Sequence, residues 1–330
     1  MNRKALALLS GGLDSTLAIK CILEQGIEVK ALNFITPFFS SKIGYKIDEI
    51  CSEFGIELKV VALVEEYFEI IKHPKYGYGS NMNPCIDCKI LMFKKAKEYM
   101  EEIGASFIIT GEVLGQRPMS QRKNTMKTID KEAGLEWLVL RPLSAKLLDP
   151  TISEIEGVVD REKLLAFCGR SRKPQFALAK DYNLKNYSWP AGGCLLTDPE
   201  FAKRMRDLVK HTPFFTINDV ELLKIGRHFR LSEGAKVIVG RDKIENERLL
   251  ELRKNGDLFL ETRDYLGPIV LFRGKDKNVL EQAGKITARY SDAPPLKEHI
   301  VVSLWEEGSN KKEGLIVVKT DKKEIESYRI

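Results

Sequence analysis

The sequence has no long apolar stretch. No uncharged apolar run reaches 18 residues, so we expect no membrane-spanning helix and no membrane partner. The chain begins with an apolar segment of strand type rather than a leader, so we expect no signal peptide and a cytoplasmic protein. Because the cytosol keeps thiols reduced, the six cysteines are not expected to pair as disulfides.

Neither sign of charge dominates the composition. There are 53 basic and 47 acidic residues, and 43% of all residues are apolar, which is enough for an ordinary core. Residues 201–330 hold about 26 basic and 21 acidic side chains, so most of the net charge of +6 lies in that part. A polyanionic partner and a lysine-rich solvated surface both explain this excess, and charge by itself does not choose between them.

The two commonest nucleotide-binding loops are missing. The sequence contains neither G-x-x-x-x-G-K-[ST] nor G-x-G-x-x-G with an acidic residue further on. Instead, an apolar run at residues 4–9 ends in Ser-Gly-Gly and is followed at once by a helical pattern headed by Asp14 and Ser15. A helix N-terminus attracts anions, and glycines let them approach the backbone. The turn is therefore either a phosphate cradle or a plain Asp/Ser-capped turn.

Strand-like runs alternate with helical patterns in the first part of the chain, at residues 4–9, 29–34, 58–63, 107–110 and 137–140. This alternation predicts an α/β domain over residues 1–200, with a parallel sheet covered by helices on both faces. Ligands of such sheets bind beyond the carboxyl ends of the strands. After Pro199 the elements become shorter. We expect a domain boundary near residues 198–214 and a smaller α+β domain with a mixed sheet at residues 214–330.

Three cysteines stand in unusual surroundings. Cys85 and Cys88 form a C-x-x-C at the start of an expected helix, whose dipole is expected to lower the pKa of the thiols. Cys194 follows a Pro-Ala-Gly-Gly segment about a hundred residues later. We expect the other three to be packing residues: Cys21, Cys51 and Cys168.

The residues leave three arrangements of these thiols open. An iron–sulfur cluster with one open iron suits three converging cysteines. A pair of catalytic thiols would need no metal. A zinc site would need a fourth ligand, for which His73 stands in the same loop as Cys85.

The motifs together resemble those of tRNA sulfur-transfer enzymes. SGGLDS resembles the PP-loop of ATP pyrophosphatases, which split ATP into AMP and pyrophosphate. NPCIDCKILMF looks like the cysteine-bearing segment of bacterial tRNA 2-thiouridylases, while GEVLGQ, the nearby SQ and LRPL are similar to tRNA 4-thiouridine synthases. One extra residue separates Gln116 from Ser120-Gln121, and no counterpart is seen of the RNA-binding domain before the PP-loop or of a rhodanese domain.

The resemblance implies a PP-loop fold of the adenine nucleotide alpha hydrolase type and an ATP-dependent tRNA sulfurtransferase. The implied reaction adenylates a uracil carbonyl oxygen, releases pyrophosphate, delivers sulfur from a three-cysteine site and releases AMP. The tail from Phe214 looks like the small RNA-binding domain of ribosome-quality-control factors. The implied partners are tRNA and a sulfur donor, either sulfide or a cysteine desulfurase relay, with a homodimer left open.

The resemblance also implies roles for residues. The leaving pyrophosphate would be held by Ser10, Gly11, Gly12, Asp14 and Ser15, with Mg²⁺ at the Asp14 carboxylate. Adenine contacts are implied at the end of the second strand, by Asn33 and Phe34. A three-cysteine, open-iron [4Fe–4S] cluster with sulfide as the donor, or alternatively Zn²⁺, is implied at Cys85, Cys88 and Cys194.

A polar loop after a later strand is expected on the same edge of the sheet. It contributes Thr110, Gly111, Glu112, Gln116 and Gln121. Gly111 would let the nucleotide come close and the two glutamines would orient the uracil or ribose, although a polar loop with a glycine turn has the same composition.

Basic and aromatic residues near these motifs suggest contacts to RNA. Phosphates could be bound by Arg117, Arg122, Lys123, Lys127, Arg170, Arg172, Lys173 and Lys180. Tyr187 and Trp189 could stack on a flipped base, or simply pack. Two other functions remain open: thiolation or amidation of a small molecule by the same chemistry, and a non-catalytic RNA-binding or zinc-stabilised module.

Overall fold

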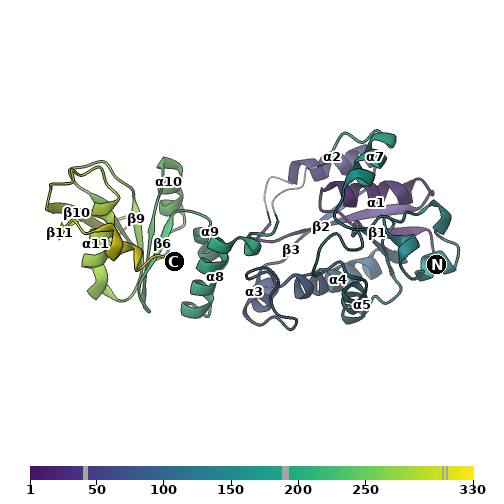
Figure 1. The fold of residues 1–330 in the computed structure, drawn as a ribbon, viewed down its shortest axis with the longest axis horizontal. Helices are drawn as coiled ribbons and strands as arrows, with labels where there is room; N and C mark the ends of the chain where they lie inside the picture. The colour runs from purple at the N-terminus through teal and green to yellow at the C-terminus, as the bar shows by residue number, and fades with distance from the viewer. Residues whose placement is uncertain (40–43, 188–192, 307, 310) are drawn as a thin grey trace. The chain divides into compact units, whose positions relative to one another are not determined.

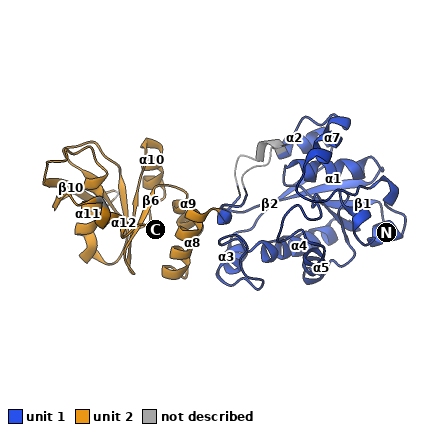
Figure 2. Ribbon diagram, in the orientation of Figure 1, with its two compact units in different colours: residues 1–197 blue, residues 198–330 orange. Residues whose placement is uncertain are grey.

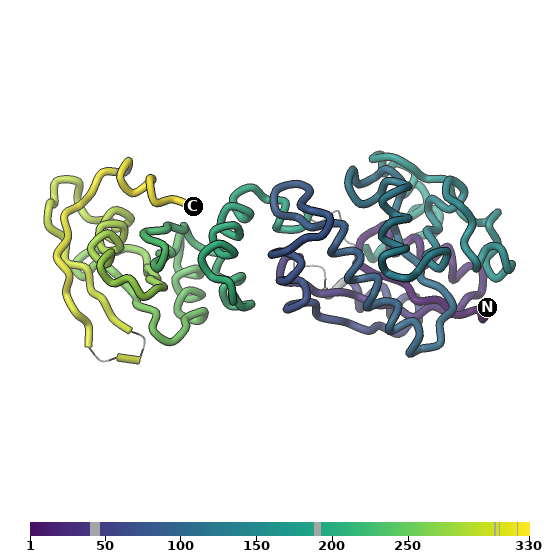
Figure 3. Tube along the Cα trace, turned by 90° about the horizontal axis from the view of Figure 1, so that it is seen from below, coloured from purple at the N-terminus to yellow at the C-terminus, as the bar shows by residue number. Residues whose placement is uncertain are grey.

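The structure is a computed structural model that describes residues 1–39, 44–187, 193–306, 308–309 and 311–330, without the side chains of residues 44–46 and 322 (Figure 1). The chain divides into two compact units, Met1–Thr197 and Asp198–Ile330 (Figure 2). The tube view in Figure 3 follows the same chain from another side. In the described part of the chain, no helix combines the length and the apolar character needed to cross a bilayer.

The first unit is built on a five-stranded sheet in the order β3-β2-β1-β4-β5, with all four strand pairs parallel. Its strands are β1 (Lys4–Leu8), β2 (Glu28–Ile35), β3 (Leu58–Ala62), β4 (Phe107–Thr110) and β5 (Val139–Leu140). The predicted α/β fold with a parallel sheet is confirmed. The chain leaves β1 toward β2 and β3 and later returns to the other side as β4, so the strand order reverses between β1 and β4, where ligands of such sheets bind.

Helices cover both faces of this sheet, as the alternation of side chains along β1 requires (Figure 1). Ala5 and Ala7 lie in the core beneath one set of helices: α1 (Leu13–Leu23), α2 (Gly44–Phe54) and α7 (Lys173–Asp181). Leu6 lies in the core on the opposite face, beneath α4 (Cys85–Glu102) and α5 (Lys123–Glu132). The helix α3 (Glu65–Lys72) packs against α4, and α6 (Ile152–Ile155) follows β5.

The second unit contains a six-stranded sheet in the order β11-β10-β8-β9-β7-β6. Its five strand pairs are antiparallel, so the expectation of a mixed sheet is wrong, while the smaller α+β unit is confirmed. The strands are β6 (Arg227–Ser232), β7 (Ala235–Val239), β8 (Leu258–Thr262), β9 (Val270–Gly274), β10 (His299–Glu306) and β11 (Glu313–Val318). The helices are α8 (Pro199–His211), α9 (Ile217–Leu223), α10 (Lys243–Glu251), α11 (Leu280–Arg289) and α12 (Lys322–Glu326).

Candidate active site

The glycine-rich turn connects β1 directly to α1. Gly11 has a φ of 72°, a left-handed conformation that favours glycine, and Gly12 is the N-cap of α1. The Gly12 carbonyl accepts hydrogen bonds from the hydroxyls of Ser15 (2.9 Å) and Thr16 (3.1 Å), while the Ser10 and Ser15 hydroxyls lie 3.2 Å apart. The serines therefore hold the turn in shape, and the first amides of α1 point out of the helix end.

The end of β4 comes very close to this turn. A Cβ atom at Gly111 would lie 2.4 Å from the Ser15 nitrogen and 2.5 Å from the Asp14 carbonyl carbon. Only a glycine allows two backbones to approach so closely. Because β1 and β4 are neighbouring parallel strands, their carboxyl ends bring the PP-loop and the loop after Thr110 to one edge of the sheet.

Asp14 has an unusual environment at this edge. One carboxylate oxygen accepts a hydrogen bond from the Gln116 amide at 2.7 Å, and the Arg172 guanidinium lies 3.8 Å away. The other oxygen, Oδ1, is buried and has no hydrogen-bond partner among the described residues. A buried carboxylate oxygen without a partner is costly, and it is the ligand type that Mg²⁺ prefers. The residues present therefore fit a magnesium ion at Asp14.

The hydrogen-bond chain from Asp14 continues to a residue that sequence reasoning missed. The Gln116 oxygen accepts a hydrogen bond from the Gln175 amide at 3.1 Å, and Gln175 is fully buried in α7. Within the described residues, the Gln175 Oε1, Gln121 Oε1 and Ser120 Oγ atoms are buried and unpaired. Gln175 lies 59 residues after Gln116 in the sequence, and no local pattern marks it as a site residue. Only the packing of α7 shows that it contacts Gln116.

The two residues expected near adenine lie differently in β2. The Asn33 amide donates a hydrogen bond to the Leu9 carbonyl at 2.8 Å and thereby ties β2 to the start of the PP-loop. The Phe34 side chain is buried in the core beneath α4. Asn33 is therefore the residue of this pair whose side chain lies at the PP-loop, while the side chain of Phe34 belongs to the core.

Glu112 is the centre of a buried ion network. Its carboxylate pairs with Lys89 in α4, and it accepts a hydrogen bond from the Arg141 Nε at 2.9 Å. Arg141, from the Leu-Arg-Pro-Leu segment, also forms a bidentate pair with Asp130 at 2.8 Å for each bond. Burial lowers the pKa of Lys89 to about 8. The Thr110 hydroxyl lies 3.4 Å from the Oε2 atom of Glu112. The network thus fastens the first turn of α4 to the loop after β4, and sequence reasoning missed Lys89 and Arg141.

The three expected cysteines lie on two neighbouring segments that are remote from each other in the sequence. Cys85 and Cys88 lie in the first turn of α4 and Cys194 directly precedes a 3₁₀ turn. The Met82 amide donates to the Leu196 carbonyl at 3.1 Å, which holds the segment after Cys194 beside the loop before α4. Each sulfur is close enough to act on the others electrostatically.

Burial controls the ionisation of these thiols. It raises the pKa of Cys88 to about 12 and that of Cys194 to about 11, and the neighbouring Cys85 sulfur adds to both shifts. The expectation that the helix dipole lowers the pKa of the C-x-x-C thiols is therefore wrong for Cys88. Desolvation of a thiolate outweighs the dipole of one helix end.

The donor set at these cysteines fits a soft metal centre. Three thiols, with no fourth protein ligand grouped with them among the described residues, have the chemistry of a cluster that keeps one open iron. Among the described residues, no three His, Cys, Asp or Glu side chains already stand around one point as metal ligands. His73, the residue considered for zinc, is exposed at the end of α3. Binding a metal would therefore require the three sulfurs to draw together and lose their protons.

The remaining cysteines differ from one another. Cys21 and Cys51 are buried in the core beneath α1 and α2, and the Cys21 sulfur lies 3.7 Å from the Tyr182 hydroxyl, so the packing interpretation is confirmed for both. Cys168 is exposed, so the packing interpretation is wrong for it. Its backbone forms a bridge with Leu114 of the loop after β4.

The basic and aromatic residues expected to contact RNA have varied surroundings. Arg172 faces Asp14, and Lys123 and Lys127 form ion pairs with Asp149 at 3.0 Å and 2.6 Å. Tyr187 packs against the core beneath α1. Trp189 lies outside the described residues, as does Pro190 of the segment before Cys194.

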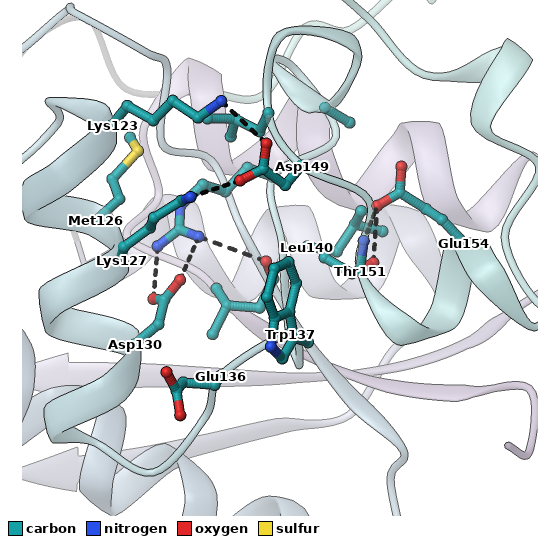
Figure 4. Close-up of a pocket in the computed structure, with 14 residues that line it drawn as sticks. Lys123, Met126, Lys127, Asp130, Glu136, Trp137, Leu140, Asp149, Thr151 and Glu154 are labelled. Carbon is teal, nitrogen blue, oxygen red and sulfur yellow. Dashed lines mark hydrogen bonds and ion pairs between the residues drawn. The ribbon is translucent and has the colours of Figure 1, made fainter.

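A separate pocket of about 120 Å³ lies between α5, β5 and α6 (Figure 4). Trp137 lines it with a half-exposed indole and a φ of 64°, and the Lys123, Lys127 and Asp149 group forms part of its wall. None of the residues expected to bind the nucleotide lines this pocket. It is connected to the site through Arg141, which lines it and also pairs with Glu112.

Two parts of the chain match known protein families. Residues 1–149 match the family described as "Thiamine biosynthesis protein (ThiI)". This stretch is ThiI-like. Residues 226–329 match the family described as "NFACT protein RNA binding domain". The resemblances drawn from the motifs are thus confirmed for both parts.

Relatives of the ThiI-like part include proteins named for tRNA thiolation. A "Probable tRNA sulfurtransferase" of Lysinibacillus sphaericus is 30% identical over 146 residues, which cover 43% of this chain and 35% of the relative. A namesake from Thermoanaerobacter sp. is 34% identical over 150 residues, covering 43% and 37%. "tRNA-specific 2-thiouridylase MnmA" of Proteus mirabilis is 28% identical and covers 39% and 38%. The chain thus spans little more than a third of the length of these relatives.

Two solved structures are also similar to this chain. One is a 4-thiouridine synthetase–RNA complex with bound ATP, with 24% identity, a TM-score of 0.36 and coverage of 55% of this chain and 51% of the other. The other is the U34-tRNA thiolase NcsA from Methanococcus maripaludis with its [4Fe-4S] cluster, with 15% identity, a TM-score of 0.30 and coverage of 67% and 68%.

Proposed function

We propose that this chain is an ATP-dependent tRNA sulfurtransferase that replaces a uracil carbonyl oxygen with sulfur. The observation that carries the proposal is the Asp14 carboxylate. It stands at the N-terminus of α1 with one buried oxygen unpaired among the described residues, in a part of the chain that matches the ThiI family. Three cysteines that act on one another electrostatically supply the second half of the chemistry.

The first step is activation of the uracil oxygen. Gly11 and Gly12 allow the outer phosphates of ATP to approach the first amides of α1, which donate to them. Asp14 would hold Mg²⁺, which neutralises charge on the leaving pyrophosphate. The uracil oxygen attacks the α-phosphorus, the bond to the β-phosphate oxygen breaks, and pyrophosphate leaves. The hydrogen bond from Gln116 fixes the Asp14 carboxylate for this task.

The second step replaces the activated oxygen. A sulfide held at the cysteine site attacks the adenylated ring carbon, and the carbon–oxygen bond breaks with release of AMP. Cys85, Cys88 and Cys194 would hold a [4Fe–4S] cluster, which when bound supplies an open iron for the sulfide. The ion pair between Lys89 and Glu112 keeps the cysteine-bearing turn of α4 beside the loop that follows β4.

The substrate would be bound by both parts of the chain. Residues 226–329 match an RNA-binding family, and most of the excess positive charge lies after residue 200. Contacts to RNA phosphates release counterions, so affinity for tRNA should fall steeply with added salt. Direct binding of a small molecule by the first unit would show no such dependence.

The test combines turnover with binding. The protein is purified without oxygen and supplied with unmodified tRNA, ATP, Mg²⁺ and sulfide. The pyrophosphate and the thiouridine that form are then quantified. Both products should appear together, and Asp14→Asn should lower pyrophosphate release by about a hundredfold or more because a neutral amide holds Mg²⁺ poorly. Filter binding of tRNA over a salt series accompanies the assay.

The outcomes separate the alternatives. Pyrophosphate without thiouridine, together with salt-independent tRNA retention, would support the small-molecule reaction instead. Tight, salt-sensitive tRNA binding without pyrophosphate release would identify a non-catalytic RNA-binding module.

A further inference from the structure

Tyr67 occupies a fixed place in the interior next to the cysteine site. The residue lies in α3 and is fully buried, with 0% of its surface exposed. Its ring stacks on Phe38, with centroids 5.3 Å apart and planes 29° apart, and Phe38 in turn meets Phe68 edge to face. The ring therefore has no freedom to move its hydroxyl away to solvent.

The Tyr67 hydroxyl is close enough to the three cysteine sulfurs to interact electrostatically with each of them. Burial raises the pKa of Tyr67 well above its usual range, and the sulfurs of Cys88, Cys194 and Cys85 add to this shift. The oxygen nevertheless makes no hydrogen bond of normal geometry within the described residues. It therefore lies near the Cys88 and Cys194 sulfurs, where it acts to lower the pKa of both thiols, without a hydrogen bond of full geometry to either sulfur.

A buried hydroxyl without a partner is rare in folded proteins, because water has been lost and nothing replaces it. Such a hydroxyl is either an unfavourable group that the fold tolerates, or a donor whose hydrogen-bond partner is a ligand that binds to the folded protein. The aromatic contacts of Tyr67 favour the second explanation, since a phenylalanine would make the same ring contacts without the unpaired oxygen.

The same residue that holds the Tyr67 ring also holds the segment of Cys194. The Phe38 carbonyl accepts a hydrogen bond from the Leu195 amide at 3.0 Å, one residue after Cys194. On its other side, α3 packs against α4, which bears Cys85 and Cys88. Tyr67 therefore lies between the segment of Cys194 and the helix that bears Cys85 and Cys88.

We propose that the Tyr67 hydroxyl donates a hydrogen bond to a sulfur anion at the Cys85–Cys88–Cys194 site and so positions that sulfur. This inference rests on the proposed function, which places metal or sulfide at these cysteines. The acceptor is a cysteine sulfur that has lost its proton to a metal, or a sulfide bound beside it. Hydrogen bonds to charged acceptors are about twice as strong as neutral ones, so the hydroxyl becomes satisfied only in the loaded protein.

The test compares Tyr67→Phe with a matched control, Tyr182→Phe. Tyr182 also places its hydroxyl beside a cysteine sulfur, that of Cys21 at 3.7 Å, but in the core beneath α1. Full-length proteins are loaded anaerobically with ferrous iron and sulfide, and the half-life of the bound iron is measured in excess chelator. The melting temperature of the metal-free proteins is measured in parallel.

Tyr67→Phe should release iron about tenfold faster than the unsubstituted chain, the size expected when a charged acceptor loses one hydrogen bond. The metal-free variant should melt at the same or a higher temperature, because an unpaired buried oxygen has been removed. Tyr182→Phe should show the opposite pattern, a lower melting temperature with unchanged iron release. Unchanged iron release in Tyr67→Phe would overturn the inference.

A cadmium titration separates this inference from the proposed function. Thiolate–cadmium absorption reports binding at the cysteines without cluster assembly or turnover. If the unsubstituted chain takes up no iron, the cluster of the proposed function fails. The role of Tyr67 then depends on cadmium affinity, which should be about tenfold weaker in Tyr67→Phe. Equal affinity, or no affinity in either protein, would refute it.

Discussion

Gly111 and Gly12 are two glycines at one edge of the sheet with opposite steric surroundings. An added Cβ at Gly111 would collide with the backbone of Asp14 and Ser15, whereas at Gly12 it would lie 3.5 Å from the Ser10 hydroxyl, an ordinary contact. Gly12 also has a φ of −85°, which alanine adopts readily. The structure thus separates a glycine required by the fold from one expected to serve the ligand.

We predict that Gly111→Ala lowers the free energy of unfolding by about 1–3 kcal/mol, because β4 and α1 must separate. Gly12→Ala should change it by less than about 1 kcal/mol yet weaken ATP binding at least tenfold, because the methyl group occupies space needed by a phosphate. Urea unfolding and ATP titration calorimetry measure the two effects. Normal ATP affinity in Gly12→Ala would contradict the phosphate-cradle assignment.

At the scale of elements, the Lys89–Glu112–Arg141–Asp130 network joins α4, the loop after β4, β5 and α5. Glu112 and Arg141 are about 8% and 5% exposed, whereas Lys123 and Lys127 at Asp149 are about half exposed. Removing one member of a buried group leaves charges without a partner, while surface pairs contribute little.

Glu112→Gln should therefore lower the free energy of unfolding by about 3–5 kcal/mol, and Asp149→Asn by less than about 1 kcal/mol. Denaturant unfolding of both variants checks the difference. If both substitutions lower the free energy of unfolding equally, Glu112 does not stabilise the fold through the buried network. Its position after β4, at the edge of the sheet expected to bind the nucleotide, would then indicate a role in ligand binding.

The local pattern of the sequence had limits that are visible in particular elements. The local sequence gives little strand signal for β6 and β11 at the edges of the second sheet, because Arg227–Ser232 is charged and Glu313–Val318 begins with a polar Glu-Gly pair. Both become strands because a neighbour supplies backbone partners, β7 for β6 and β10 for β11. Tertiary pairing overrode weak propensity.

On the scale of the whole molecule, the two units differ in buried histidine. His73, the sole histidine of the first unit, is exposed, whereas His228 in β6 is 1% exposed and donates to the Ile225 carbonyl at 2.8 Å. Burial, assisted by Lys236 and Arg204, lowers the pKa of His228 well below its usual range. Near pH 6.5 the His228 imidazole therefore takes up a proton in the unfolded chain, whereas it stays neutral in the folded second unit.

Acidification from pH 7 to 5.5 should accordingly destabilise the second unit selectively, by up to about 1.4 kcal/mol per pH unit below 6.5. Hydrogen exchange of peptides from β6 and β7, corrected for intrinsic rates, should accelerate relative to peptides from β1. His228→Gln, which keeps a donor for the carbonyl, should remove most of this change. Burial also lowers the pKa of His211, so the protonation of His211 destabilises the folded second unit in the same direction. Equal acceleration in both units would contradict the prediction.

The sequence by itself determined the alternation of strands and helices, the glycine turn at residues 10–12 and the three cysteines worth following, since each depends on local periodicity or on residues adjacent in the chain. Only the tertiary structure decided that Asp14 keeps an oxygen unpaired among the described residues, that Gln175 reaches Gln116, and that Tyr67 lies beside the segments that bear the three cysteines. Such partners are chosen by the packing of helices over a sheet. Burial and distance between remote residues leave no trace in a local pattern.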